Sequence, residues 1–333
     1  MPDAVRPELR GRGRPGGTIG IRHHLLVIPS VLCAAQAAKV IAEGMAGAVA
    51  IEHQHGCSQL GGDAHLTEQI LTGLGIHPNV AGTLVVSLGC ETVQGLHLFH
   101  AIQGRGQRAE FVGIQQAGGT LAAIEAGREA LARLRTATAA DPDLPMPRRA
   151  LRVGVEAAWL ALPARQAAVF ARVIDRLLAD GAVVIQAVPA AETPPAPHGP
   201  PDAPPPPLLG RPVSWAAYAA PIPASGQGLF LMPAPRTRIA QKTGLAAAGA
   251  QVIVSPLVEG LPAGSPVAPV VHVGIAPYAR PFAHDVEVML EMEPAPGADA
   301  ALLEALDAAC RDETITEAIG MFEMAIHRIG PTM

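Results

Sequence analysis

The segment 53–63 concentrates side chains that can do chemistry. It places two imidazoles, a thiol, an amide and a carboxylate among glycines (His53, His55, Cys57, Gln59 and Asp63). An apolar run, 46–51, precedes it, so we predict a loop that leaves the end of a strand. Imidazole and thiolate are typical ligands of divalent metals such as Fe(II) and Zn(II), and an imidazole can also act as a general base.

Cysteines follow two more apolar runs in the same relative position. Residues 25–32 lead into Cys33, and residues 83–89 lead into Cys90 and Glu91. Each run is short, continuous and bounded by turn residues, which is typical of a buried strand. Because open α/β sheets bind ligands at the carboxyl ends of their strands, we expect the three cysteine-bearing loops to converge on one site.

Each cysteine has a structural alternative. A single cysteine is more often a small buried apolar side chain than a ligand, and this is the role we expect for Cys310 within a predicted helix. Cys33 lies in an apolar context and fits either role. Cys57 and Cys90 each follow a glycine and have polar neighbours, which favours ligation.

These considerations give a set of working assignments. The expected metal ligands are Cys57, Cys90 and His53, with Cys33 as an additional candidate; the expected catalytic residues are His53, His55 and Glu91; the expected substrate contacts are Gln59 and, after a fourth predicted strand, Gln115. The sequence leaves open which histidine is a base and which is a ligand. Both histidines have a further alternative, because an imidazole in this loop could cap the following helix or bind a substrate carboxylate.

A glycine- and proline-rich loop, 260–266, forms a second constellation. It lies between two predicted strands and contains Gly260, Gly264 and Ser265. Backbone N–H groups of such loops can bind anionic groups, but the two prolines in this loop lack that donor. We therefore expect a contact with a substrate carboxylate or hydroxyl, and a purely structural turn is the alternative.

Strand-like and helix-like runs alternate along the chain. The predicted strands are 24–32, 47–52, 83–88, 110–114, 150–155, 182–188, 228–232, 250–255 and 268–274. The predicted helices are 34–44, 63–74, 92–103, 118–136, 164–180, 238–248, 299–311 and 314–325. This alternation predicts an α/β fold of two Rossmann-like domains with mostly parallel sheets. We place a flexible tail at 1–17, a first domain with the His/Cys loops at 18–140, and a second domain at 150–330 that is interrupted by a Pro-rich linker, 189–212.

Composition limits the class of protein. The 333 residues carry a net charge of −5 and the pI is about 6.2, which argues against broad nucleic-acid binding. No apolar run approaches the roughly 20 residues of a membrane span, and the chain shows no signal-peptide pattern. Four cysteines in this length do not form a disulfide scaffold. We expect a cytoplasmic homo-oligomer, with the arginines of 6–14 in a solvated tail.

Several motifs occur along the chain in a fixed order. They are Gly20-Ile21-Arg22, Pro29 to Cys33, His53 to Gly61 with Asp63, His77-Pro78-Asn79, and Leu88 to Glu91 with Gln94, followed by Thr243 to Ala250, Gly260 to Pro269, and Glu313-Thr314 with Glu317, Gly320 and Glu323. Together they resemble the catalytic part of the altronate and galactarate dehydratases, whose relatives include sulfolactate sulfo-lyase. The resemblance covers most of residues 18–330.

The resemblance implies a carbon–oxygen hydro-lyase that acts on a small hydroxy acid or sugar acid. Such an enzyme removes the proton α to a carboxylate and then expels the β-hydroxyl. The family implies a divalent metal, with Fe(II) expected first and Mn(II), Mg(II) or Zn(II) as alternatives; this metal would stabilise the enediolate-like intermediate. Some members carry a small N-terminal domain as a separate chain, so we also expect a small-domain partner subunit. No nucleic-acid or membrane partner is expected.

The second half departs from the family pattern. A Cys-Gly-Gly-Ser-Asp motif is replaced by Val155 to Trp159, a Glu-x-Pro-Glu element by Gln186 to Ala190, and a Thr-Thr-Gly-Arg-Gly loop by Pro256 to Gly260. These departures leave two hypotheses, a divergent dehydratase and a non-catalytic paralogue that binds a carboxylate ligand or a partner subunit. A zinc-stabilised structural protein is less consistent with the sequence, because structural zinc ligands cluster in short loops.

Overall fold

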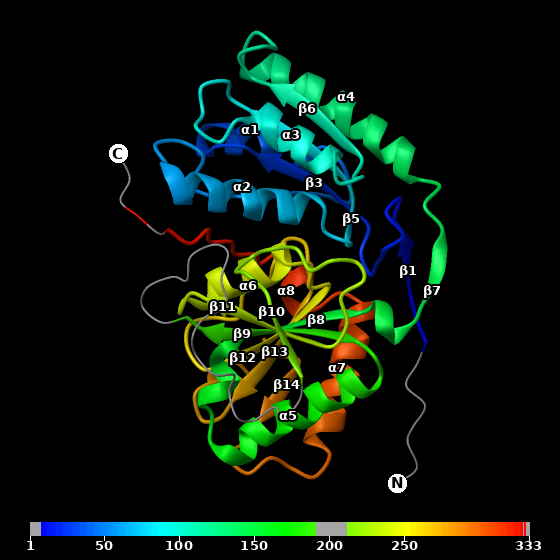
Figure 1. The fold of residues 1–333 in the computed structure, drawn as a ribbon, viewed down its shortest axis with the longest axis vertical. Helices are drawn as coiled ribbons and strands as arrows, with labels where there is room; N and C mark the ends of the chain where they lie inside the picture. Colours follow the sequence, from blue (N-terminus) through cyan, green and yellow to red (C-terminus); the bar gives the residue numbers. More distant parts are fainter. Residues whose placement is uncertain (1–7, 191–211, 329, 331–333) are drawn as a thin grey trace.

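Two parallel β-sheets covered by helices form the upper and lower lobes of the molecule in Figure 1. The computed structural model describes residues 8–190, 212–328 and 330. Within both large sheets every strand pair is parallel. The predicted α/β class with mostly parallel sheets is confirmed. In the described parts of the chain, no helix has the length and apolar character that crossing a membrane requires.

The upper lobe is built on a four-stranded sheet of order β4-β3-β5-β6. Its strands are β3 (His24–Pro29), β4 (Ala48–Ala50), β5 (Val80–Ser87) and β6 (Ala109–Gly113). Helices α1 (Ala35–Glu43) and α4 (Thr120–Thr138) pack together on one face, and α2 (Gly61–Gly75) and α3 (Gly95–Gln103) cover the other. The interior strand β5 is buried along its whole length, as expected for a strand with helices on both faces.

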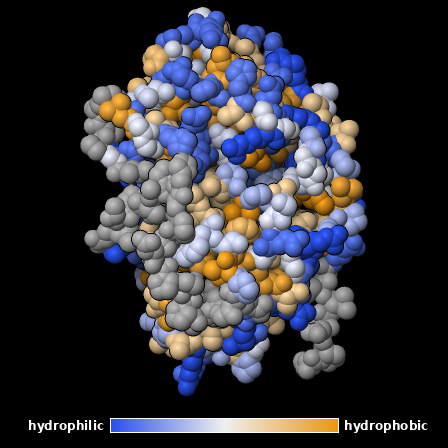
Figure 2. All heavy atoms as spheres, viewed as in Figure 1, coloured by the Kyte–Doolittle hydropathy of each residue, from blue (hydrophilic) through white to orange (hydrophobic). Residues whose placement is uncertain are grey.

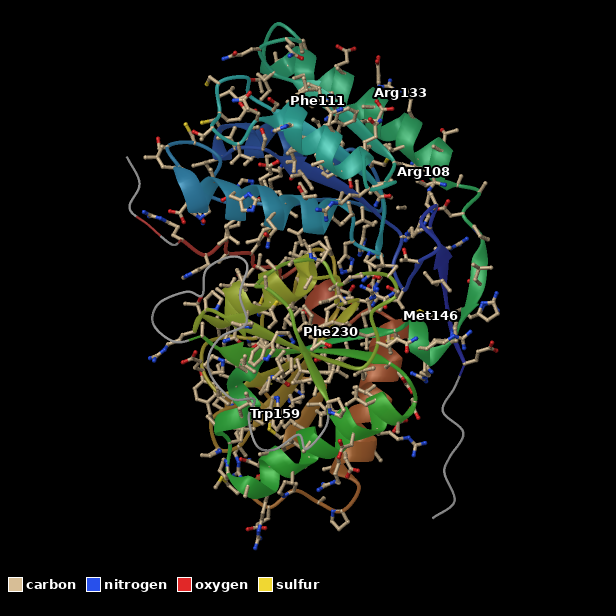
Figure 3. All side chains as sticks on the ribbon, viewed as in Figure 1. Arg108, Phe111, Arg133, Met146, Trp159 and Phe230 are labelled. Carbon is tan, nitrogen blue, oxygen red and sulfur yellow. The ribbon has the colours of Figure 1, made fainter. Side chains whose placement is uncertain are left out.

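The lower lobe is built on a seven-stranded sheet of order β10-β11-β9-β8-β12-β13-β14. Its strands are β8 (Arg152–Val155), β9 (Val183–Pro189), β10 (Val213–Trp215), β11 (Leu229–Ala234), β12 (Val252–Leu257), β13 (Val270–Ile275) and β14 (Val288–Leu290). Helices α5 (Ala164–Ala179) and α7 (Ala298–Arg311) pack together on the outer face, whereas α6 (Arg238–Ala247) covers the face toward the upper lobe. Trp159, which Figure 3 labels, lies in this lobe. It is buried and stacks on Phe170 of α5.

A small antiparallel sheet lies along one side of the molecule beside both lobes (Figure 1). It consists of β1 (Leu9–Gly13), β2 (Ile19–Gly20) and β7 (Asp143–Met146). The prediction of a flexible tail at 1–17 is therefore wrong for residues 9–13, which pair with β2 and β7. Residues 1–7 lie outside the described part of the chain. The arginines are not all solvated either, since Arg14 is buried.

The two lobes share one hydrophobic core. Helix α2 packs against α6, and a single cluster joins apolar residues of both sheets, including Ile70 of the upper lobe and Leu245 of the lower lobe. A side chain on Gly73 would overlap the backbone of Ala247, so this glycine permits the close approach of the two helices. The domains predicted from the sequence are therefore packed as one body in this structure.

Four short 3₁₀ helices and one further α-helix occur in the described chain. Short 3₁₀ helices lie at η1 (Leu32–Ala34), η2 (Arg148–Ala150), η3 (Ala157–Ala161) and η4 (Arg280–Phe282). The helix predicted at 314–325 is much shorter, because α8 (Ile315–Ala318) ends before Gly320, whose φ of 68° is left-handed. Most of the predicted Pro-rich linker, residues 191–211, lies outside the described residues.

Candidate active site

The four strands of the upper lobe end at one edge of their sheet. Because β3, β4, β5 and β6 are parallel, their carboxyl ends share this edge. The chain leaves β3 toward β4 on one side and later enters β5 on the other side of β3. The edge between β3 and β5 is therefore a topological switch point, which is where open α/β sheets bind ligands.

Backbone hydrogen bonds fasten the three cysteine-bearing loops to one another. The N–H of Leu32 donates to the carbonyl oxygen of His55 at 3.0 Å, and the N–H of Thr92 donates to that of Gly56 at 2.9 Å. Gly56 has a φ of 99°, and a side chain there would overlap the carbonyl oxygen of Ser30. The backbones of the three loops therefore meet, as their positions in the sequence predicted.

Glu91 is the buried anion of this edge, with 2% of its surface exposed. Its Oε1 accepts hydrogen bonds from the hydroxyls of Ser30, at 2.8 Å, and Ser87, and its Oε2 accepts one from the N–H of Gly89 at 2.6 Å. Burial alone raises the pKa of Glu91, but these hydrogen bonds outweigh it and hold the pKa below its usual range. The carboxylate stays ionised and joins the ends of β3 and β5.

The three cysteines of this edge, Cys33, Cys57 and Cys90, are exposed, whereas Cys310 is buried in α7. Their soft thiolate donors suit iron or zinc chemistry. Within the described residues, however, no three His, Cys, Asp or Glu side chains stand together as a metal site. The side chains in this arrangement do not form a preassembled metal centre, although their loops are in contact.

His53 uses both ring nitrogens in hydrogen bonds, one to the end of β3 and one within its own loop. It is 2% exposed, its Nε2 donates to the carbonyl oxygen of Pro29 at 2.8 Å, and its Nδ1 accepts the N–H of His55 at 3.2 Å. Burial lowers the pKa of His53 to about 4, so this imidazole is neutral at pH 7. In this arrangement it offers no nitrogen lone pair to a metal or a substrate proton.

His55 is half-buried and is placed differently. Its Nε2 lies 3.1 Å from the carbonyl oxygen of Ile326, in the segment that follows α8. Because a carbonyl oxygen only accepts hydrogen bonds, Nε2 carries the proton and Nδ1 is the basic nitrogen of the neutral ring. The described structure shows no hydrogen bond to that nitrogen. His55 is thus the histidine of this loop that can accept a proton.

The two predicted substrate-binding glutamines have different environments. Gln59 is buried, its Oε1 accepts the N–H of Gly56 at 3.0 Å, and its Nε2 has no hydrogen-bond partner among the described residues. Gln115 is exposed at the end of β6, and its side chain lies against Gly89 beside Cys90. Gln115 can therefore contact a ligand directly, whereas Gln59 mainly holds the loop.

The 260–266 loop belongs to the lower lobe and is tied to the segment after α8. Gly264 pairs with that segment through a bridge to Phe322, Ser265 is buried, and Gly260 accepts a hydrogen bond from the hydroxyl of Tyr278 at 2.8 Å. The buried Lys242 donates to the carbonyl oxygen of Ala263. These contacts hold the loop at the carboxyl edge of the lower sheet.

The same lower edge carries a polar cluster that the sequence analysis did not identify. Arg238, at the start of α6, donates from Nε to Glu156 at 3.2 Å and from Nη2 to the hydroxyl of Ser255 at 2.8 Å. Glu156 is fully buried, and its Oε1 has no partner among the described residues. The position of Glu156 directly after the predicted strand 150–155 could have identified this cluster, because β8 and β12 also flank a topological switch point.

A family model matches the segment that carries these loops. Residues 11–139 match the model described as "D-galactarate dehydratase/Altronate hydrolase, second domain". This segment contains the end of β1, all of β2 to β6 and the three cysteines of the upper edge. The lower lobe lies outside the match.

Three curated proteins show similarity to part of the chain. Altronate dehydratase of Bacillus subtilis is 30% identical over 158 residues, 44% of this chain and 31% of the relative. Altronate dehydratase of Escherichia coli is 36% identical over 101 residues, 27% of this chain and 20% of the relative. The (2R)-sulfolactate sulfo-lyase subunit beta of Chromohalobacter salexigens is 33% identical over 128 residues, 37% of this chain and 32% of the relative. The matched segments thus span less than one third of each relative.

Proposed function

Since residues 11–139 match the model of a second domain of D-galactarate dehydratase/altronate hydrolase, we propose that this chain is a carbon–oxygen hydro-lyase acting on a small hydroxy acid or sugar acid. The observation that carries the proposal is the set of interlocked loops at the β3/β5 edge. These loops bring exposed thiols, a free imidazole nitrogen and an exposed amide to the switch point of the matched domain.

In this proposal His55 is the general base. Its Nε2 is held by the carbonyl oxygen of Ile326. Its Nδ1 is therefore the nitrogen that removes the proton α to the substrate carboxylate. Gln115 donates its amide N–H to a substrate oxygen. His53 and Glu91 position the loops, because their polar atoms are taken up by Pro29, Ser30 and Gly89.

A divalent metal is part of the proposal, with Fe(II) tested first and Mn(II), Mg(II) and Zn(II) as alternatives. Cys57 and Cys90 are the proposed ligands, and Cys33 is an additional one. A metal at this edge would polarise the substrate carboxylate and hydroxyl. Because the described side chains do not form a ligand set as they stand, no catalytic step is assigned to the metal. A small-domain partner subunit, a homo-oligomeric assembly and a cytoplasmic location complete the proposal.

The first experiment measures metal content and turnover together. Protein purified without oxygen and its Cys57→Ser variant are analysed for bound metal, and both are assayed with altronate, galactarate and sulfolactate. We expect near-stoichiometric metal and dehydration of altronate or galactarate in the parent, and a loss of at least about tenfold in metal affinity in the variant. Cys310→Ala is the matched control, because this cysteine lies in α7, away from the edge.

Unchanged metal content in Cys57→Ser would remove Cys57 from the ligand set. The absence of both metal and turnover, after reconstitution with each metal, would overturn the hydro-lyase proposal. It would favour the second candidate, a non-catalytic paralogue that binds a carboxylate ligand. The loop contacts that occupy His53 and Glu91 support that candidate, and a carboxylate titration that perturbs the His55 ring resonances would establish it.

A further inference from the structure

A cavity of about 310 Å³ lies between the lobes, at the edge opposite the cysteine loops. Its walls come from the turn between β1 and β2, the carboxyl ends of α2 and α6, the turn after α3 and the start of β8. Apolar side chains such as Ile76 and Ile222 form part of the lining, and three arginines, Arg14, Arg105 and Arg152, form another part. The volume is in the range of small-molecule sites.

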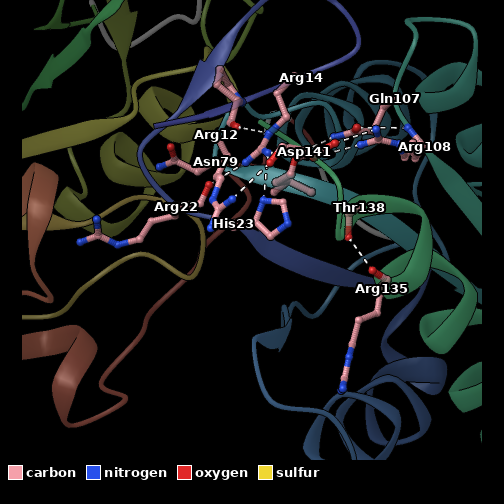
Figure 4. A network of polar contacts seen from close by, with 12 residues as sticks. Arg12, Arg14, Arg22, His23, Asn79, Gln107, Arg108, Arg135, Thr138 and Asp141 are labelled. Carbon is pink, nitrogen blue, oxygen red and sulfur yellow. Dashed lines mark hydrogen bonds and ion pairs between the residues drawn. The ribbon is translucent and has the colours of Figure 1, made fainter. Parts of the chain in front are cut away.

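The lining contains no Asp or Glu. The neighbouring carboxylate, Asp141, accepts hydrogen bonds from Arg14 at 3.3 Å and also from Arg108 at 2.7 Å and 3.1 Å, as Figure 4 shows. His77, at the cavity wall, is neutral at pH 7 because burial lowers its pKa to about 3. Asp141 thus pairs both with Arg14 of the lining and with Arg108, which lies outside the lining.

Arg152 is a buried cation in the wall of the cavity. It is 8% exposed and donates to the carbonyl oxygens of Ile222, at 2.7 Å, and Pro223, at 2.8 Å. Among the described residues it has no carboxylate partner. Buried charges in proteins are normally paired, and burial here lowers the pKa of Arg152.

The ends of α2 and α6 offset only part of this charge. Each helix carboxyl end contributes about half a negative charge. Three guanidinium groups and two helix ends therefore leave an excess of about two positive charges at the lining, because Asp141 is offset by Arg108. A ligand that matches this excess carries at least two negative groups.

We propose that this cavity binds a small organic polyanion through Arg105 and Arg152. Arg14 adds its positive charge, because its nitrogens already contact Pro78, His23, Asp141 and Arg22. Guanidinium groups recognise carboxylates and phosphates in the same bidentate manner, and the apolar wall around Ile76 and Ile222 accommodates a carbon skeleton. The proposal does not depend on the hydro-lyase chemistry, because the cavity and the cysteine loops lie at opposite edges of the sheet and share no residue.

Bound polyanion would link the lobes. Arg105 belongs to the upper lobe, Arg14 lies in the turn between β1 and β2, and Arg152 begins a strand of the lower lobe. A ligand that bridges them binds the folded molecule and not the unfolded chain, so it raises the thermal midpoint in proportion to the logarithm of its concentration.

The test uses citrate and inorganic pyrophosphate as probes, with sodium chloride at matched ionic strength as the salt control. Calorimetric titration and thermal unfolding are recorded for the full chain and for Arg105→Gln, an exposed position whose replacement leaves the core intact. We expect one site per chain, a midpoint increase with at least one probe, and affinity about tenfold weaker in Arg105→Gln. Arg135→Gln, which removes an exposed arginine of α4, is the matched control and should bind as the parent does.

The Arg152→Gln variant should lose binding altogether, provided that circular dichroism shows it folded. A response to citrate alone identifies a polycarboxylate ligand, and a response to pyrophosphate alone identifies a phosphate-bearing one; both support the site. No midpoint change beyond that of the salt control, or equal affinities in Arg105→Gln and Arg135→Gln, would overturn the proposal.

Discussion

At the scale of single residues, the β3/β5 edge separates side chains that hold loops from side chains that face a ligand. Glu91 and His53 have the residue types of an acid and a base, yet each is 2% exposed and bound to neighbouring loops. His55, Gln115 and the three cysteines keep polar atoms at the surface. The sequence predicted which loops meet, because each follows a strand. It did not reveal which polar atoms the neighbouring loops occupy, since those partners are distant backbone groups.

His53 makes a prediction about pH. Burial lowers its pKa to about 4, whereas a histidine in an unfolded chain titrates near 6.5. The unfolded state therefore binds the proton first, and stability falls as the pH drops from about 6.5 toward about 4. Between pH 6.5 and 5 one such histidine costs about 2 kcal/mol. His53→Gln keeps an N–H donor without titrating, so urea unfolding should show a smaller loss of stability from pH 7 to pH 5 than in the parent.

His65→Gln is the matched control for that experiment, because His65 is exposed on α2. It should keep the pH dependence of the parent. The other buried histidines, His24 and His77, also have lowered pKa values, about 4 and about 3. His53→Gln therefore removes only part of the loss of stability between pH 7 and pH 5. An identical loss of stability between pH 7 and pH 5 in His53→Gln and the parent would show that His53 is not buried as a neutral ring.

At the scale of elements, the sequence predicted the strands that a local apolar run marks. It missed the strands that form only by pairing with a distant segment. The apolar runs that became β3, β4, β5 and β12 were recognisable because parallel strands are buried on both faces. β1 and β7 were not predicted, because they alternate polar and apolar residues weakly and pair across more than 130 positions. The helix predicted at 314–325 was wrong beyond α8, where the chain pairs with Gly264.

The contact between α2 and α6 depends on Gly73. It predicts that Gly73→Ala changes the stability in the direction opposite to the usual one. Replacing glycine by alanine inside a helix normally stabilises it by about 1 kcal/mol. Here the new methyl group would overlap the carbonyl oxygen of Ala247, so Gly73→Ala should destabilise the protein by about 1–3 kcal/mol in urea unfolding. Gly16→Ala is the control, since nothing lies within 4 Å of a side chain there. A stabilised Gly73→Ala protein would contradict the close packing of the two helices.

At the scale of the whole molecule, polar links reinforce the shared core. Arg22 donates to both carboxylate oxygens of Glu317 at 2.9 Å and so joins the upper lobe to α8. Asn79 donates to the carbonyl oxygens of Gln251, at 2.9 Å, and Val267, at 3.0 Å. These residues belong to motifs that resemble the dehydratase family, and in this structure their role is to join the lobes.

The surface differs between the lobes on the face of Figure 2, where hydrophilic residues cover much of the upper lobe and hydrophobic residues reach the surface of the lower lobe.

The shared core predicts that both lobes unfold in one transition. The chain has two tryptophans, Trp159 and Trp215, and both belong to the lower lobe, so their fluorescence reports that lobe, whereas far-ultraviolet circular dichroism reports both. If the lobes separated first, the apolar faces of α2 and α6 would be exposed to water. This exposure costs about 25 cal/mol of free energy for each Å² of apolar surface. The two urea curves should therefore superimpose, and Gly73→Ala, a change in the upper lobe, should lower both midpoints equally. A dichroism change that precedes the fluorescence change would mean that the upper lobe unfolds independently.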